Sequence, residues 1–135
     1  MGRETDDAVY RLAEAIRSGE AVAVQKLLCT EAAAVCDSAG LIPALTGTFH
    51  GTQDVARLVT LIASVVPHAD LTVEAVNGRS GLVMRRAAGE AVAVVAVETN
   101  EASETGDTSE AGIRVLWIVL NPDKLSRWHR FPETC

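Results

Sequence analysis

The chain has 135 residues, of which 48% are hydrophobic and 22% are charged. This composition suits one domain with a real core and excludes an intrinsically disordered chain. Eighteen acidic residues against twelve basic ones give a net charge of −6, which repels a phosphate backbone. The one basic cluster, Lys124, Arg127, His129 and Arg130, lies near the C-terminus. Direct nucleic-acid binding is therefore not expected.

The sequence also gives no sign of a membrane or secretory protein. No apolar run approaches the roughly twenty residues that span a bilayer, and the N-terminus has no secretory apolar segment and no lipidation signal. Cys29, Cys36 and Cys135 lack the spacing of a metal or redox motif, so we interpret them as small hydrophobic residues. We expect a cytoplasmic protein without a membrane partner.

The N-terminal half predicts three helices and two short strands. Asp6 or Asp7 caps a first helix that ends at Ser18-Gly19, a second short helix covers 20–28, and strands follow at 33–37 and 43–49. The strongest helix begins near Thr52 and ends before Pro67. Apolar residues recur in the first and third helices at helical spacing, at Val9, Leu12, Ala13 and Ile16, and at Val55, Leu58, Val59, Ile62 and Val66.

Three strands follow at about 71–76, 81–86 and 91–98. They are joined by Asn77-Gly78, a strong signal for a two-residue hairpin, and by Ala88-Gly89. Counting outward from these turns puts Leu71, Met84 and Ala93 in one row across the strands, and Val73, Leu82 and Val95 in the next. We expect this apolar face to contact the helices and the mixed face, which carries Glu74, Arg85 and Glu98, to point outward.

The stretch from Ile113 to Leu120 is apolar except for Arg114 and predicts a central strand that Asn121-Pro122 ends. If Arg114 points outward, simple alternation turns Ile113, Val115, Trp117, Val119 and Asn121 inward. Before this strand, residues 99–112 are rich in acidic and small polar types. They predict a solvated loop, with an acidic docking arm as the alternative.

Four segments carry a family resemblance. Val76-Asn77-Gly78, Gly81-Leu82-Val83, residues 89–95 and the ending Val-Leu-Asn-Pro-Asp-Lys-Leu at 119–125 resemble the SnoaL-like domain at the C-terminus of certain extracytoplasmic-function sigma factors. That domain belongs to the nuclear transport factor 2-like superfamily. The run Asp37-Ser38-Ala39-Gly40 departs from the pattern, because those domains usually have Asp followed by three glycines.

The resemblance implies an α+β fold in which a curved antiparallel sheet wraps as a cone around about three N-terminal helices. We expect a single domain over residues 1–135, with a core at about 9–125, the acidic loop at 99–112 and a C-terminal tail at 126–135. In this superfamily the cone is commonly a ligand pocket. The residues expected to contact an apolar small molecule there are Ser80, Met84, Val95, Trp117 and Asn121.

Asp37 is the first candidate for catalysis. A carboxylate that enters a dry pocket has a raised pKa and can transfer protons near neutral pH. The alternative is that Asp37 only caps the turn through Ala39-Gly40. Tyr10 is a second candidate, by analogy with ketosteroid isomerase, a distant relative by fold. His50 is a third acid or base, unless it is simply an exposed loop residue.

Two functions follow from these observations. The first is a cofactor-independent cyclase, isomerase or dehydratase of SnoaL-like type that acts on an apolar, polyketide-like substrate. The sequence shows no metal-ligand spacing and no phosphate-binding loop, so no cofactor is expected. The second is a non-catalytic ligand-sensing or regulatory domain, related to the sigma-factor domain, with the transcription machinery as its partner.

The outer face of the sheet predicts a homodimer. Its apolar members under this assignment form a larger patch than soluble monomers usually expose, and pairing about a two-fold axis would bury it. These residues are Val83, Val92, Val94, Ala96, Leu116, Ile118 and Leu120.

Overall fold

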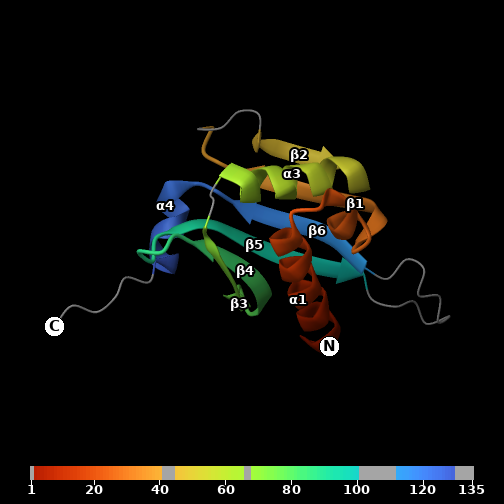
Figure 1. The fold of residues 1–135 in the computed structure, drawn as a ribbon, viewed down its shortest axis with the longest axis horizontal. Helices are drawn as coiled ribbons and strands as arrows, with labels where there is room; N and C mark the ends of the chain where they lie inside the picture. Colours follow the sequence, from red (N-terminus) through yellow and green to blue (C-terminus); the bar gives the residue numbers. More distant parts are fainter. Residues whose placement is uncertain (1, 41–44, 66–67, 101–111, 130–135) are drawn as a thin grey trace.

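The computed structural model describes residues 2–40, 45–65, 68–100 and 112–129 (Figure 1). Two helices open the chain, a third follows the first two strands, and a short helical segment follows the last strand. The elements are α1 (Gly2–Ser18), α2 (Ala21–Gln25), β1 (Leu28–Asp37), β2 (Gly47–His50), α3 (Thr52–Val65), β3 (Asp70–Val76), β4 (Arg79–Arg85), β5 (Ala91–Asn100), β6 (Gly112–Val119), α4 (Pro122–Leu125) and the 3-10 turn η2 (Ser126–Trp128). The predicted α+β class is confirmed.

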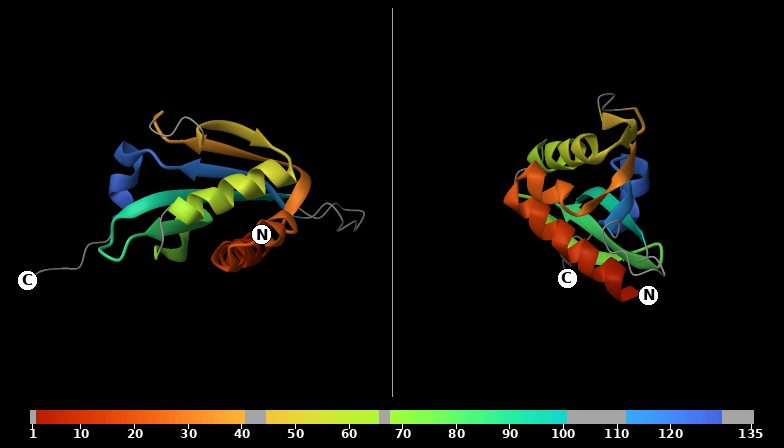
Figure 2. Two further views of the ribbon diagram at one scale, coloured as in Figure 1. Left: turned by 45° about the horizontal axis from the view of Figure 1, so that its top comes forward. Right: turned by 90° about the vertical axis from the view of Figure 1, so that its right-hand side faces the viewer.

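The six strands form one curved sheet in the order β2-β1-β6-β5-β4-β3 (Figure 2). β6 is flanked by β1 and β5, so its predicted central position is confirmed. Neighbours are antiparallel except for β1 and β6, which run parallel. Asn77 and Gly78 both have positive φ, as a type I′ hairpin requires. The two predicted rows of side chains across β3, β4 and β5 also match the observed register.

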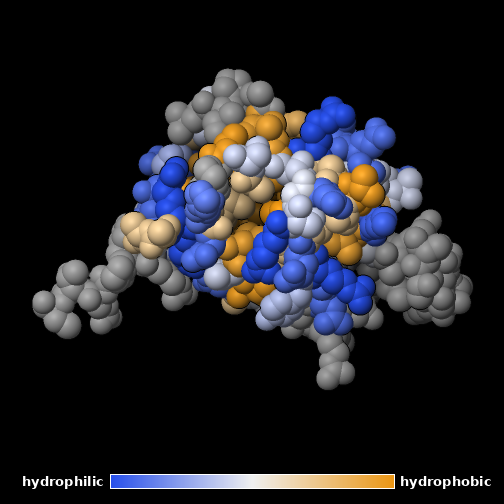
Figure 3. Space-filling model, viewed as in Figure 1, coloured by the Kyte–Doolittle hydropathy of each residue, from blue (hydrophilic) through white to orange (hydrophobic). Residues whose placement is uncertain are grey.

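Helices α1 and α3 cover the inner face of the sheet. α1 contacts β3, β4 and β5, whereas α3 contacts β1 and β2. Every predicted apolar position of the two helices that the structure describes is buried: Val9, Leu12, Ala13, Ile16, Val55, Leu58, Val59 and Ile62. Seen from the helix side, apolar surface is visible between the two helices, with polar side chains around it (Figure 3). The core therefore lies between these helices and the inner face.

One extra residue in β6 changes the direction of its side chains. Thr99 of β5 pairs with Ile113, whereas the preceding Glu98 pairs with Val115, so Arg114 has no residue opposite it. This is a β-bulge, in which two residues of one strand oppose one residue of the other. The side chains of β6 therefore do not alternate regularly between the two faces of the sheet on passing Arg114.

After the bulge the facing of β6 is the reverse of the prediction. Leu116 and Ile118 are buried in the core beneath the helices, and Trp117 lies on the outer face with 48% of its surface exposed. The inward placing of Val115, Trp117 and Val119 is wrong, and that of Ile113 is right. The predicted outer patch is therefore partly wrong, because Leu116, Ile118 and Leu120 pack against the inner core. Val92 also packs there, because a second bulge, in β5, pairs Arg85 with Ala91 and Met84 with Ala93 and leaves Val92 without a residue opposite it.

The segment after Pro122 folds back over the outer face, on the side of the sheet opposite α1 and α3 (Figure 2, right). Leu125 is buried there against Val76, Val83, Ala91 and Val94. The predicted tail at 126–135 is thus packed against the sheet as far as His129, whose Nδ1 accepts the Ala91 N–H at 2.8 Å. Of the predicted acidic loop, residues 101–111 lie outside the described part of the chain.

Cys29 and Cys36 are buried and free, as expected, whereas Cys135 lies outside the described residues. Burial, together with the neighbouring Asp37 carboxylate, raises the pKa of the Cys36 thiol to about 11. None of the described helices has the length and apolar character needed to cross a membrane.

Candidate functional site

The inside of the cone is almost filled by side chains. A void of about 20 Å³ remains between α1, α3 and the sheet. It has room for about one water molecule, and a buried water needs polar partners. Met84 and Val95, two of the expected ligand contacts, line this void, but all its lining residues are apolar: Ile16, Val59, Ile62, Leu71, Leu82, Met84, Ala93, Val95 and Ile118. This void, as the described residues line it, offers neither space nor a polar group for a substrate.

Asp37 does not enter that interior. It ends β1 on the outer face, where its Oδ2 accepts a hydrogen bond from Lys124 Nζ at 2.7 Å and its Oδ1 accepts the Ala39 N–H at 3.0 Å. These two bonds, that of Lys124 first, hold the pKa of Asp37 below its usual value. The expected rise in pKa is therefore wrong. The alternative role, capping of the turn, agrees with the bond to Ala39.

The other two catalytic candidates lie apart from Asp37. Tyr10 is on α1, on the inner side of the sheet, and is 60% exposed. His50 is exposed on β2 opposite Ala33. Ala33 is four residues before Asp37 on β1, which corresponds to roughly 13 Å along a strand. The structure does not bring the three side chains into one constellation.

The remaining predicted contacts also lie outside the interior void. Ser80 is half-buried in β4 opposite Ala75, beside the hairpin turn. Asn121 caps α4, because its side-chain oxygen accepts the Asp123 N–H at 3.1 Å. Trp117 faces outward, as described above. No group of three potential metal ligands is present among the described residues.

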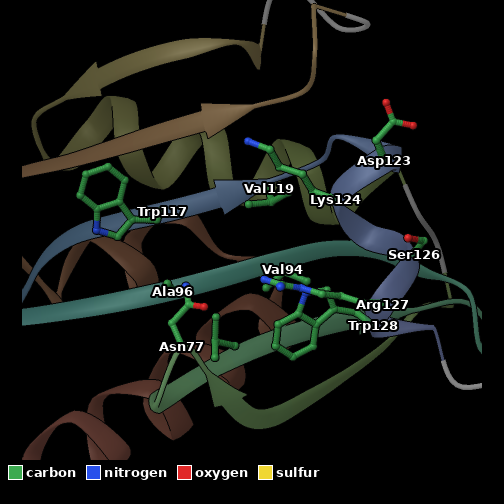
Figure 4. A pocket seen from close by; sticks show the side chains of 11 residues that line it. Asn77, Val94, Ala96, Trp117, Val119, Asp123, Lys124, Ser126, Arg127 and Trp128 are labelled. Atoms are coloured by element: carbon green, nitrogen blue, oxygen red, sulfur yellow. The ribbon is translucent and has the colours of Figure 1, made fainter.

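The outer face carries a groove that we call the tryptophan groove. It has a volume of about 450 Å³ and lies between β5, β6 and the C-terminal turn (Figure 4). Trp117 and Trp128 line it, and these are the only two tryptophans of the chain. Its other lining residues are Val76, Asn77, Val94, Ala96, Val119, Asp123, Lys124, Ser126 and Arg127. The sequence did not predict this groove, although two members of the C-terminal basic cluster, Lys124 and Arg127, line it.

Two cationic side chains, Lys124 and Arg127, line the tryptophan groove. Lys124 is paired with Asp37, whereas Arg127 has no carboxylate partner among the residues that the structure describes. The Arg127 guanidinium carbon lies 5.7 Å from the centre of the Trp128 ring, a cation–π distance. Arg127 therefore lines the groove over the Trp128 ring.

A second cavity of about 450 Å³ lies at the mouth of the cone, between the end of α3 and the start of β5. Leu45, Ile62 and Val92 contribute apolar surface, and Ile62 also borders the interior void. The ion pair between Arg86 and Glu90, 3.5 Å apart, flanks this cavity, and both side chains are more than half exposed. None of the predicted catalytic residues lines it.

Comparison with solved structures supports the fold. Extracytoplasmic function sigma factor SigJ of Mycobacterium tuberculosis matches with a TM-score of 0.60 and 22% identity over 91% of this chain and 44% of that chain. A protein of unknown function with a cystatin-like fold from Methylobium petroleophilum PM1 matches at 0.59 and 11% identity, over 99% and 80%. A protein titled Rd1NTF2_05 with long sheet matches at 0.56 and 14% identity, over 84% and 94%.

These matches define a class by fold. The chain has the α+β cone of the nuclear transport factor 2-like proteins, as the sequence resemblance implied. It spans less than half of the SigJ chain. No protein-family model matches the sequence, and no curated protein matches it. At these identities the likeness concerns the fold, so function has to be argued from the site.

Proposed function

We propose that the chain is a non-catalytic regulatory domain that binds its partners through the outer face of its sheet. The proposal is supported by the difference between the interior of the cone and the outer face of the sheet. The interior retains a void of only about 20 Å³ without polar groups, whereas the outer face exposes Trp117 beside a groove of about 450 Å³. Recognition surfaces commonly use an exposed tryptophan as an anchor.

The enzyme expected from the resemblance has weaker support. A cyclase or isomerase for a polyketide-like substrate needs a pocket of several hundred Å³, together with a positioned acid or base. The void is far smaller, and Asp37 is bound to Lys124 on the opposite side of the sheet. Catalysis remains a prediction. The second cavity, of about 450 Å³, has the size of a substrate pocket, but none of the three predicted catalytic residues lines it.

The binding surface that we propose is an outer strip made of Ala33, Val35, Ala96, Val115 and Trp117. Val35 of β1 is opposite Trp117 of β6, which is opposite Ala96 of β5, so the strip is continuous across three strands. Apart from Trp117, its side chains are half-buried in the single chain. Contiguous apolar surface of this kind is typical of an interface.

We propose a second copy of the chain as the first occupant of this strip. The rim carries both signs of charge, in the pair of Arg114 with Glu98 at 2.6 Å and the pair of Lys124 with Asp37. A two-fold axis through the strip would bury the apolar residues and leave these pairs at the edge. A stable interface buries roughly 800 Å² on each partner, which requires the strip together with its polar rim.

The fold shared with part of a sigma factor supports the transcription machinery as the regulated partner. A direct test is binding of the purified chain to purified bacterial RNA polymerase, with and without an extracytoplasmic-function sigma factor. We expect binding that Trp117→Glu abolishes and that Tyr10→Glu leaves intact, because Tyr10 is exposed on the opposite side of the sheet. Absence of binding, or equal loss in both variants, would reject this partner.

A further inference from the structure

We propose that the tryptophan groove binds a small planar aromatic molecule that carries an acidic group. This goes beyond the function proposed above, which assigns no ligand to the groove. The groove shares Trp117 and Ala96 with the outer strip, whereas Trp128 and Arg127 belong to the groove alone, so variants of Arg127 and Val115 can separate ligand binding from self-association.

The apolar part of the groove fits an aromatic ring system. Its volume of about 450 Å³ lies in the range of small-molecule pockets, roughly 300–1,000 Å³. Val94, Ala96 and Val119 come from adjacent strands and provide an apolar surface beneath the ligand. Trp117 projects from β6, and Trp128 lies on the side of the C-terminal turn (Figure 4). Two indole rings beside a flat apolar surface favour stacking with another aromatic ring.

The polar part of the groove selects an acid. Of the two cations that line the groove, Lys124 is paired with Asp37, whereas Arg127 has no carboxylate partner in the described part of the chain and lies over the Trp128 ring. Asp123 is the one acidic residue in the lining, and Figure 4 shows its side chain directed away from both tryptophans. A ligand acid can therefore accept charge-assisted hydrogen bonds from Arg127 while its ring covers Trp128.

Two further polar side chains set the geometry of the ligand. Asn77 projects from the β3–β4 hairpin on the side of the groove away from α4 (Figure 4), where its amide can hydrogen-bond a ring substituent. Lys124 is held by Asp37 at 2.7 Å and can reach an acid only by sharing that carboxylate. Arg127 is therefore the main determinant of charge selectivity.

The test uses 2-naphthoate as the probe, with 2-naphthalenemethanol and 2-naphthylmethylamine as neutral and cationic analogues. Binding is followed by calorimetry and by the two indole N–H signals in a ¹H–¹⁵N spectrum. Because both tryptophans of the chain line the groove, both signals report on it. We expect saturable binding of 2-naphthoate that shifts both signals, about tenfold weaker binding of the neutral analogue, and none of the cationic one.

Two variants serve as test and control. Arg127→Ala should weaken 2-naphthoate binding about tenfold and bring it to the level of the neutral analogue. Arg11→Ala, on α1 across the sheet, should change nothing. Val115→Glu should disrupt self-association and bind 2-naphthoate at least as tightly as the wild type, because a dimer that covers Trp117 competes with the ligand. Failure of the dimer therefore does not mimic failure of the ligand site. Absence of saturation, signal shifts that exclude the indoles, or equal affinity of the acid and neutral probes would overturn the proposal.

Discussion

Gly81 lies at a tightly packed point of the outer face. A Cβ at this position would lie 2.6 Å from Cγ2 of Val76 and 2.5 Å from the carbonyl oxygen of Val95. The carbonyl belongs to the neighbouring strand and cannot move without disturbing the sheet. We expect Gly81→Ala to lower the free energy of unfolding by about 1–3 kcal/mol, measured by urea denaturation. Gly78→Asn should cost much less, since that position is open and asparagine tolerates positive φ.

The pair of Asp37 and Lys124 predicts a pH dependence. The folded-state pKa of Asp37 is lowered, first by the hydrogen bond from Lys124. The pair therefore stabilises the fold above the unfolded pKa of about 3.9, and this contribution is lost as the pH falls through the lower folded pKa. Lys124→Ala should have a lower melting temperature than the wild type at pH 7, and the difference should shrink below pH 4. A difference that is constant from pH 7 to pH 2 would contradict the assignment.

Among the contacts between elements, those of Arg85 on β4 connect the C-terminal segment to the sheet. Its side chain is nearly buried, its Nη2 binds Glu74 Oε1 at 2.9 Å, and its Nε donates to the Trp128 carbonyl at 3.0 Å. Arg85→Met would remove the charge partner of the half-buried Glu74 carboxylate, so we expect a loss of about 3–5 kcal/mol and faster hydrogen exchange in α4 and η2. Arg114→Met breaks an exposed pair and should cost less than about 1 kcal/mol. Equal losses would show that Arg85 has no special role.

The elements also show what the sequence can predict. The register of β3, β4 and β5 was predictable because two short turns fix the pairing and one face is clearly apolar. The facing of β6 was not, because its apolar residues occupy both faces and the single polar marker, Arg114, is the bulged residue itself. The four-residue α4 is too short to show helical periodicity, so the cover over the outer face was missed.

At the scale of the whole molecule, the fold was predictable and the site was not. The order of elements and the resemblance both pointed to the cone, but they do not determine whether side chains fill it. That depends on how Ile16, Ile62 and Met84, from three elements, meet across the interior. The outward direction of Trp117 and the position of Trp128 depend on the bulge and on the C-terminal turn. The tryptophan groove therefore becomes visible only in three dimensions.

The outer strip, with Trp117 at its middle, is in our proposal the surface that binds a second copy of the chain. Equilibrium sedimentation at micromolar concentration measures whether such a dimer forms. We predict twice the mass of one chain for the wild type and for Tyr10→Glu, and the mass of one chain for Trp117→Glu. A wild type that sediments as a single chain, or a Trp117→Glu variant that remains a dimer, would show that the outer strip is not the self-association surface.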